Sequence, residues 1–85
     1  MPRTHNPEGE KEFNIRLGQR MRRYRKLRGY TIEKLAEVTY CSYSAYIAYE
    51  SGKTAAPAYV LSLLCIFLKI PANDLLDVPD NSWQF

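Results

Sequence analysis

Apolar residues return at intervals of three and four from Phe13 onward, which is the spacing of one buried stripe along an α-helix. The residues of this stripe are Phe13, Leu17, Met21, Tyr24 and Leu27. Gly29 follows the last turn, and glycine often ends a helix because it tolerates a left-handed backbone. The pattern therefore predicts one helix from Phe13 to Gly29.

Two shorter helices are expected next, each preceded by a hydroxyl side chain that can accept a hydrogen bond from the first turn. Thr31 is placed to cap a helix over residues 32–39. Ser42 is placed to cap another helix, which runs to about Ser51 before Gly52 ends it.

The carboxy-terminal half predicts two more helices. Pro57 restarts the chain, and the apolar run over residues 58–69 is longer than an ordinary buried strand. Pro71 opens a short final helix through Leu76. With no alternating strand pattern, the sequence predicts an all-α domain of five helices.

One compact domain is expected, because 85 residues of which 46% are apolar support a single core. Residues 1–12 predict a flexible amino-terminal arm, since they carry little apolar side chain to offset the entropy of ordering. Residues 13–77 form the predicted domain. Residues 78–85 form a tail in which Trp83 and Phe85 could pack within the chain or against a second subunit.

Positive charge is concentrated in the first predicted helix. Seven of the twelve basic residues lie there with no acid between them: Arg16, Arg20, Arg22, Arg23, Arg25, Lys26 and Arg28. Such a cluster is typical either of a polyanion partner or of a solvated helix face.

The sequence gives little support for metal binding, catalysis or insertion into a membrane. Cys41 and Cys65 lie among apolar residues, and with one histidine they form no metal-ligand pattern. No nucleophile and base pair, paired carboxylates or Gly-rich phosphate loop is evident, so we expect neither an enzyme nor a bound cofactor. The apolar run over residues 58–68 is shorter than the roughly 20 residues that a membrane helix needs, and the polar amino terminus does not resemble a secretion signal. A cytoplasmic protein that does not span a membrane is expected.

Two short helices joined by a short turn fit the helix-turn-helix unit, whose second helix enters the major groove of DNA. The surrounding segments LGQRMRRYRKLRGYTIEKLAEVTYCSYSAYIAYESGK and LSLLCIFLKIPANDLL resemble the lambda-repressor-like (XRE-type) helix-turn-helix family without gaps from Leu17 to Leu76. The resemblance implies a DNA-binding transcriptional regulator with double-stranded DNA as its partner. It also implies an ion pair between Arg25 and Glu50 that links the first helix to the third.

By that resemblance, the outer side of the third helix faces the bases while residues around it hold phosphates. The residues predicted to bind DNA are Thr31, Ile32, Ser42, Tyr43, Ser44, Ile47, Ala48, Lys53 and Thr54. Arg20 or Arg28 could add further phosphate contacts.

This predicted surface departs from what the family's DNA readers usually carry, which is glutamine in place of Ile32 and polar or basic side chains in place of Tyr43 and Ala48. Hydroxyl and apolar groups cannot make the bidentate hydrogen bonds of an amide or a guanidinium. Few direct hydrogen bonds from this surface would therefore identify a base. Two interpretations are open: a regulator that leans on DNA shape, or a scaffold whose tyrosine-rich surface binds a protein partner.

Tyrosine stands at every third position from Tyr40 to Tyr49. At about 100° per residue, Tyr43, Tyr46 and Tyr49 span about 120° of a helix and cannot share one role. Tyr46 and Tyr49 match inward positions of the family, and we expect their hydroxyls to reach the edge of the core. Tyr40 replaces a turn glycine, so either a left-handed tyrosine costs about 1 kcal/mol or the turn is shaped differently.

The fourth predicted helix is apolar all round, which indicates cover on both faces. Facing Leu61, Leu64, Cys65 and Leu68 toward the core leaves Tyr59, Leu63 and Ile66 outside, flanked by Phe67. Such a patch is uncommon on a monomer, and the related repressors pair through this region. We therefore expect a homodimer interface formed by Tyr59, Leu63, Ile66, Phe67, Trp83 and Phe85, and a dimeric repressor on a pseudo-palindromic operator.

Overall fold

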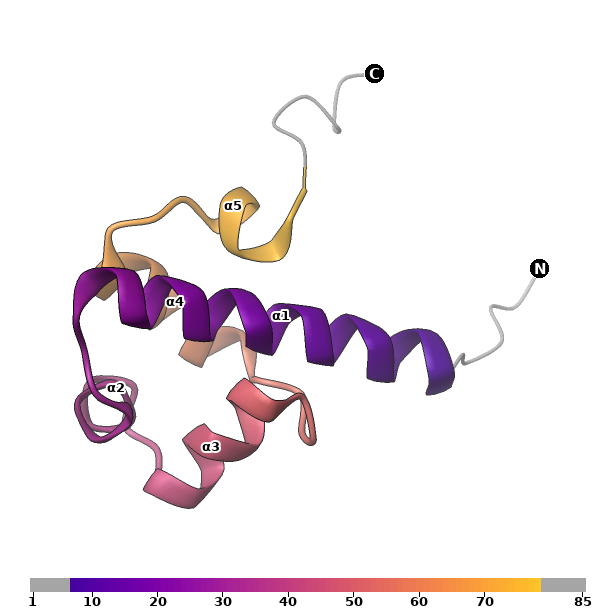
Figure 1. The fold of residues 1–85 in the computed structure, drawn as a ribbon, viewed down its shortest axis with the longest axis horizontal. Coiled ribbons are helices and arrows are strands. Elements are labelled where there is room, and N and C mark those ends of the chain that lie inside the picture. Colours follow the sequence, from indigo (N-terminus) through magenta and orange to yellow (C-terminus); the bar gives the residue numbers. More distant parts are fainter. Residues whose placement is uncertain (1–6, 79–85) are drawn as a thin grey trace.

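The computed structural model describes residues 7–78, and this part of the chain consists of five helices without a strand (Figure 1). The helices are α1 (Pro7–Arg28), α2 (Ile32–Val38), α3 (Tyr43–Ser51), α4 (Ala58–Leu68) and α5 (Ala72–Leu76). The all-α prediction with five helices is confirmed.

Helix α1 begins at Pro7, so the part of the predicted arm over residues 7–12 is helical instead of flexible. Proline suits the first position of a helix. Glu8 and Glu10 lie in the first turn, where negative charge stabilises the helix by interacting with its dipole. The prediction of an arm rests on the small number of apolar side chains in this segment and does not take these stabilising effects into account. Residues 1–6 and the predicted tail beyond Val78 lie outside the described residues.

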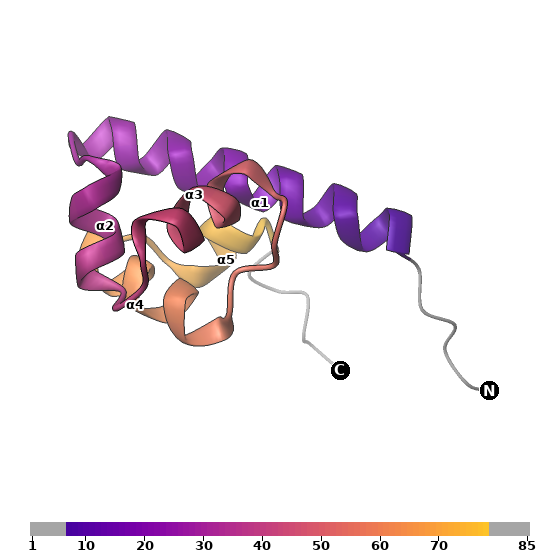
Figure 2. The ribbon, with the colours of Figure 1, turned by 90° about the horizontal axis from the view of Figure 1, so that it is seen from below.

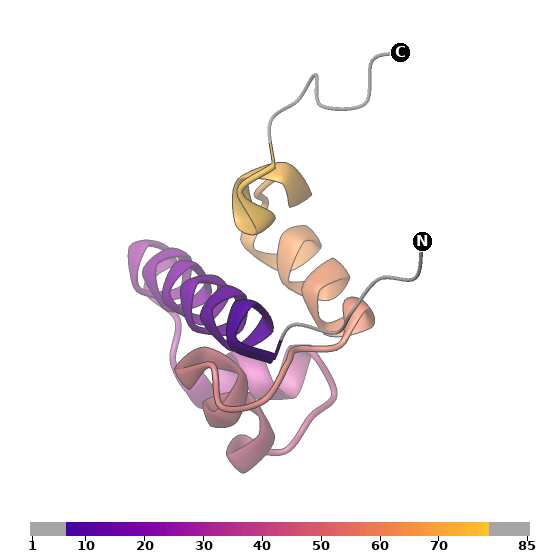
Figure 3. The same cartoon turned by 90° about the vertical axis from the view of Figure 1, so that its right-hand side faces the viewer.

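Helices α3, α4 and α5 pack directly on α1, whereas α2 packs mainly on α3 and α4. Figure 3 shows α2 and α3 on one side and α4 and α5 on the other. The amino-terminal end of α1 projects past the rest of the domain, as Figures 1 and 2 both show. Within the helix-turn-helix unit, α3 lies directly on the long helix α1, and α2 is held in place through α3 and α4.

The core lies where these helices meet. Its buried residues are Leu17, Met21, Leu35, Ala36, Tyr46, Val60, Leu64, Leu68, Ile70 and Leu75. The predicted stripe on α1 is wrong at both ends, because Phe13 is 47% exposed and Leu27 is 68% exposed. Phe13 lies on the projecting part of α1, and a straight stripe drifts away from its partners over so many turns.

Helix α4 is rotated relative to the expectation, since it buries Val60, Leu64 and Leu68 while Leu61 and Cys65 are only half-buried. With apolar residues on every side, periodicity could not fix which stripe faces inward. Phe67, expected outside, is half-buried and packs on Tyr30 with ring centroids 4.7 Å apart.

Helices α1 and α3 cross at Gly18 with their backbones in contact. A Cβ atom at Gly18 would lie 2.8 Å from the Tyr49 carbonyl oxygen and nearer still to the backbone of Glu50. Gly52, which ends α3 with φ 80°, packs in the same way on Ile15 of α1, where a Cβ would lie 2.8 Å from the Ile15 nitrogen. Small residues at both points let α3 lie directly on α1.

Gly18→Ala should lower the free energy of unfolding by at least about 2 kcal/mol, because the added methyl meets backbone that can yield only by separating two helices. Denaturant unfolding followed by circular dichroism measures the change. Gly29→Ala is the matched control: Gly29 has φ 79° with open space around it, so only about 1 kcal/mol of left-handed strain is expected. Equal losses in the two variants would contradict the close crossing.

Candidate nucleic-acid interface

Side-chain caps fix the start of each helix of the helix-turn-helix unit. The Thr31 Oγ1 atom accepts a hydrogen bond from the Lys34 N–H at 3.1 Å, and the Ser42 Oγ atom accepts one from the Ala45 N–H at 3.0 Å. Both caps agree with the sequence prediction. Each hydroxyl retains its hydrogen, so each could still donate a hydrogen bond to a phosphate oxygen.

The turn between α2 and α3 contains a left-handed tyrosine, Tyr40, with φ 60°. The Tyr40 N–H donates to the Glu37 carbonyl at 3.2 Å and the Cys41 N–H donates to the Ala36 carbonyl at 3.0 Å, which closes the end of α2. The turn therefore keeps the glycine-type shape, at a cost of about 1 kcal/mol. The Tyr40 ring is 81% exposed, so no burial within the domain offsets this strain.

A part-buried ion pair ties α3 to α1. The Arg25 guanidinium contacts both carboxylate oxygens of Glu50, at 2.8 Å from Nε and 3.2 Å from Nη2, and it also donates to the Tyr30 carbonyl at 3.1 Å. The side chains of Arg25 and Glu50 are only 11% and 7% exposed. The hydrogen bond to Glu50 raises the pKa of Arg25. This is the pair that the family resemblance implies, and it orients α3.

Tyr46 and Tyr49 lie on the inner side of α3, where Tyr46 is fully buried and Tyr49 is half-buried. The prediction that the hydroxyl reaches the edge of the core is wrong for Tyr46, because the Tyr46 hydroxyl oxygen is itself buried. Burial, followed by the negative charge of Glu50, raises the pKa of Tyr46. The phenol therefore stays neutral and serves the packing of α3.

The outer side of α3 carries the recognition face, defined as Tyr43, Ser44, Ile47 and Ala48. Tyr43 is 49% exposed and Ile47 is 39% exposed, Ser44 is exposed, and Ala48 is half-buried. Ile32, at the start of α2, is half-buried and packs against the core. The recognition face is therefore open, and it presents hydroxyl, aromatic and aliphatic groups without an amide or a guanidinium.

Lys53 and Thr54 are exposed just beyond the end of α3, where their N–H groups donate to the Ala48 carbonyl at 3.0 and 3.3 Å. Arg20 and Arg28 each use one guanidinium nitrogen for a hydrogen bond within the domain. The Nε atom of Arg20 donates to the Leu75 carbonyl at 2.6 Å. Arg28 uses its Nε in the same way on the carbonyl of Leu68 at 2.9 Å. These arginines cap the ends of α5 and α4 with one nitrogen each, so a phosphate contact would have to come from their remaining guanidinium N–H groups.

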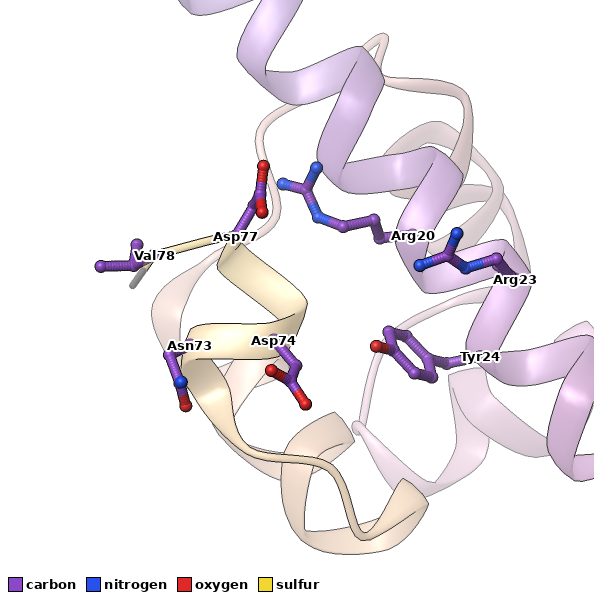
Figure 4. Close-up of a pocket in the computed structure, with 7 residues that line it drawn as sticks. All are labelled: Arg20, Arg23, Tyr24, Asn73, Asp74, Asp77 and Val78. Atoms are coloured by element: carbon purple, nitrogen blue, oxygen red, sulfur yellow. The ribbon is translucent and has the colours of Figure 1, made fainter. Parts of the chain in front are cut away.

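A groove of about 480 Å³ lies between α1 and α5. Figure 4 shows Arg20, Arg23 and Tyr24 of α1 facing Asp74 and Asp77 across it. No sequence signal indicates this groove, because it depends on how α5 packs against α1. The two carboxylates offset the two guanidinium groups, and the groove lies on the α5 side of α1, so it does not extend the recognition face.

Within residues 7–78 no three histidine, cysteine, aspartate or glutamate side chains gather in a way that could hold a metal ion. In the same part of the chain no helix combines the length and the apolar character needed to cross a membrane.

Comparison with known proteins defines the class. The sequence profile of the helix-turn-helix family HTH_3 matches residues 21–75. Among solved structures, the restriction-modification controller protein C.AhdI from Aeromonas hydrophila aligns with a TM-score of 0.67 and 26% sequence identity, covering 72% of this chain and 92% of that protein. No curated protein matches the chain significantly.

The chain belongs to the HTH_3 helix-turn-helix family. The family and the structural likeness to a controller protein define it as a DNA-binding transcription regulator.

Glu50→Ala should lower the free energy of unfolding by about 3 kcal/mol, because it leaves the buried Arg25 guanidinium without its carboxylate. Thermal and denaturant unfolding measure the loss. Glu12→Ala is the control, since the Arg16–Glu12 pair is 65% and 67% exposed and should contribute less than about 0.5 kcal/mol. A loss for Glu50→Ala as small as that for Glu12→Ala would refute the structural role of the pair.

Proposed function

We propose that this protein is a homodimeric repressor that binds a pseudo-palindromic operator through α3. One observation carries the proposal: α3 is capped, clamped to α1 and inward-packed through Tyr46, yet its outer side is open. A helix held in this way can enter a major groove as a rigid body. The whole predicted DNA-binding set lies around this helix or at the start of α2.

Phosphate contacts in this proposal come from groups that flank α3. The Lys53 ammonium and the hydroxyls of Thr31, Ser42 and Thr54 are exposed and lie near the ends of α2 and α3. Lys34, the cation on α2, lies 3.8 Å from Glu37 and is partly neutralised. The positive charge at this surface is therefore small, which favours modest non-specific affinity.

The dimer is proposed on α4 and α5. Tyr59 is 54% exposed and Ile66 is 70% exposed. Beside Ile66 runs an apolar groove of about 360 Å³, lined by Ala58, Leu61, Ser62, Cys65, Ile66, Ala72, Leu75 and Leu76. Leu63 and Phe67 of the predicted interface are half-buried, whereas Trp83 and Phe85 lie outside the described residues.

Dimerisation through α4 and α5 leaves α3 free, because the two surfaces lie on opposite sides of α1 (Figure 3). A two-fold axis would set two α3 helices about 34 Å apart, one turn of DNA, and so require an inverted repeat. Repression follows if that repeat overlaps a promoter. The likeness to a protein described as a restriction-modification controller supports a role in gene control.

A protein-binding adaptor is the second candidate, favoured by the exposure of Tyr40, Tyr43 and Ile47 on one side of the domain. Exposed tyrosine is common at protein interfaces, and such an interface needs no phosphate anchors. Failure of the folded protein to bind any duplex, together with capture of a protein partner that Tyr43→Ala abolishes, would favour the adaptor.

Selection of binding sites from random duplexes tests the proposed regulator. We expect enrichment of an inverted repeat with half-sites about one DNA turn apart. Transcription in vitro from a promoter that contains the enriched site should fall when the protein is added. A folded protein that enriches no sequence would contradict DNA-based regulation.

Affinity for the enriched duplex should fall as salt rises, and Lys53→Ala should flatten the slope of log K against log salt by about 0.9, one released counterion. Fluorescence anisotropy over a salt series measures the slope. Lys69→Ala is the control, since Lys69 is exposed just after α4, at the end of that helix away from Lys53. An unchanged slope in Lys53→Ala would remove Lys53 from the phosphate contacts.

Ile66→Lys should shift the protein from dimer toward a species of 9.9 kDa at micromolar concentration, because an ammonium would be buried without a partner. We expect the dissociation constant of the dimer to rise at least about tenfold. Light scattering coupled to size exclusion measures it. Leu27→Lys, at an exposed leucine of α1, is the control, and a wild-type protein of 9.9 kDa throughout would overturn the dimer.

A further inference from the structure

We propose that the recognition face distinguishes base pairs chiefly by the C5-methyl group of thymine in the major groove. The inference rests on the proposed DNA binding through α3 and names the chemical feature that α3 reads. It starts from which groups the structure leaves available on that face.

The hydrogen-bonding groups of the recognition face discriminate poorly. Tyr43 and Ser44 offer single hydroxyls, and a hydroxyl can either donate or accept, so it suits several base edges. Ser51, one turn beyond Ile47 on the same side of α3, already donates its hydroxyl hydrogen to the Ala48 carbonyl at 3.1 Å. No side chain of the recognition face offers the paired donors, or the donor and acceptor together, that bidentate hydrogen bonds to guanine or adenine require.

The apolar groups of the face are well placed for a different contact. Tyr43 and Ile47 are one turn apart on α3 and both are exposed, and Ala48 lies beside Ile47. In the major groove the one apolar feature that separates base pairs is the C5-methyl group of thymine. Ile47 and Ala48 can enclose that methyl, and the Tyr43 ring can cover a neighbouring one.

The fixed orientation of α3 makes this reading selective. The buried pair of Arg25 and Glu50 and the close crossing at Gly18 prevent α3 from rotating to present other side chains. Each enclosed methyl should change affinity by about fourfold, from about 0.8 kcal/mol for one buried methylene-sized group. Several thymines across two half-sites would multiply to a substantial preference.

Two random duplex pools, one built with thymidine and one with deoxyuridine throughout, test the proposal. Uracil pairs as thymine does and lacks only the C5-methyl group. We expect the thymidine pool to enrich thymine-containing half-sites and the deoxyuridine pool to enrich none. In the best duplex, single replacements of thymidine by deoxyuridine should weaken binding about fourfold at contacted positions and leave affinity unchanged in the flanks.

Ile47→Ala identifies the side chain. In this variant the loss caused by deoxyuridine at the position that Ile47 contacts should disappear, whereas Leu27→Ala, at an exposed leucine on α1, should keep it. Circular dichroism establishes that both variants are folded. This coupling separates a methyl contact from a general loss of stability.

The outcomes distinguish the two proposals. Specific enrichment that is equal in both pools would overturn methyl reading while leaving DNA binding intact. So would Ile47→Ala if every deoxyuridine loss, at all positions, persisted in it. No enrichment in either pool by a folded protein would overturn both.

Discussion

At Gly18 the backbone of α1 lies against the last turn of α3 with no room for a methyl group, and the rest of the domain is arranged around this contact. Gly52 repeats the close approach against Ile15, and Arg25 locks the far side of the crossing through Glu50. Close packing gives the helix pair one relative orientation because there is no adjustable side chain between the backbones. The direction in which α3 presents its outer side is therefore set by α1.

Local signals in the sequence were sufficient for the helix-turn-helix unit. Thr31 and Ser42 accept the hydrogen bonds that their positions predicted, and Gly29 and Gly52 end helices with positive φ. Each of these effects involves residues only a few positions apart. The turn at Tyr40 shows the limit of such reasoning, because the resemblance identified the strained position but could not choose between strain and another shape.

The features that the sequence did not predict depend on contacts between distant residues. Arg20 and Arg28 donate to backbone carbonyls 55 and 40 positions away, and such contacts leave no pattern among the side chains of the sequence. The predicted inward stripe of α4 is correct for Leu64 and Leu68 but omits Val60, because the circumference of this helix is apolar throughout and only packing against the other helices selects Val60. The recognition face could be located, but which chemistry it reads had to be argued from exposure and geometry.

The arginine caps also show that the isoelectric point of the chain and the positive charge on its DNA-facing surface are different quantities. An isoelectric point of about 9.0 suggests a strongly cationic surface. Arg20, Arg25 and Arg28 instead direct guanidinium nitrogens to carbonyls or to a carboxylate within the fold. Three of the twelve basic residues thus help to assemble the domain, so the isoelectric point alone does not measure the positive charge that a duplex would meet at α3.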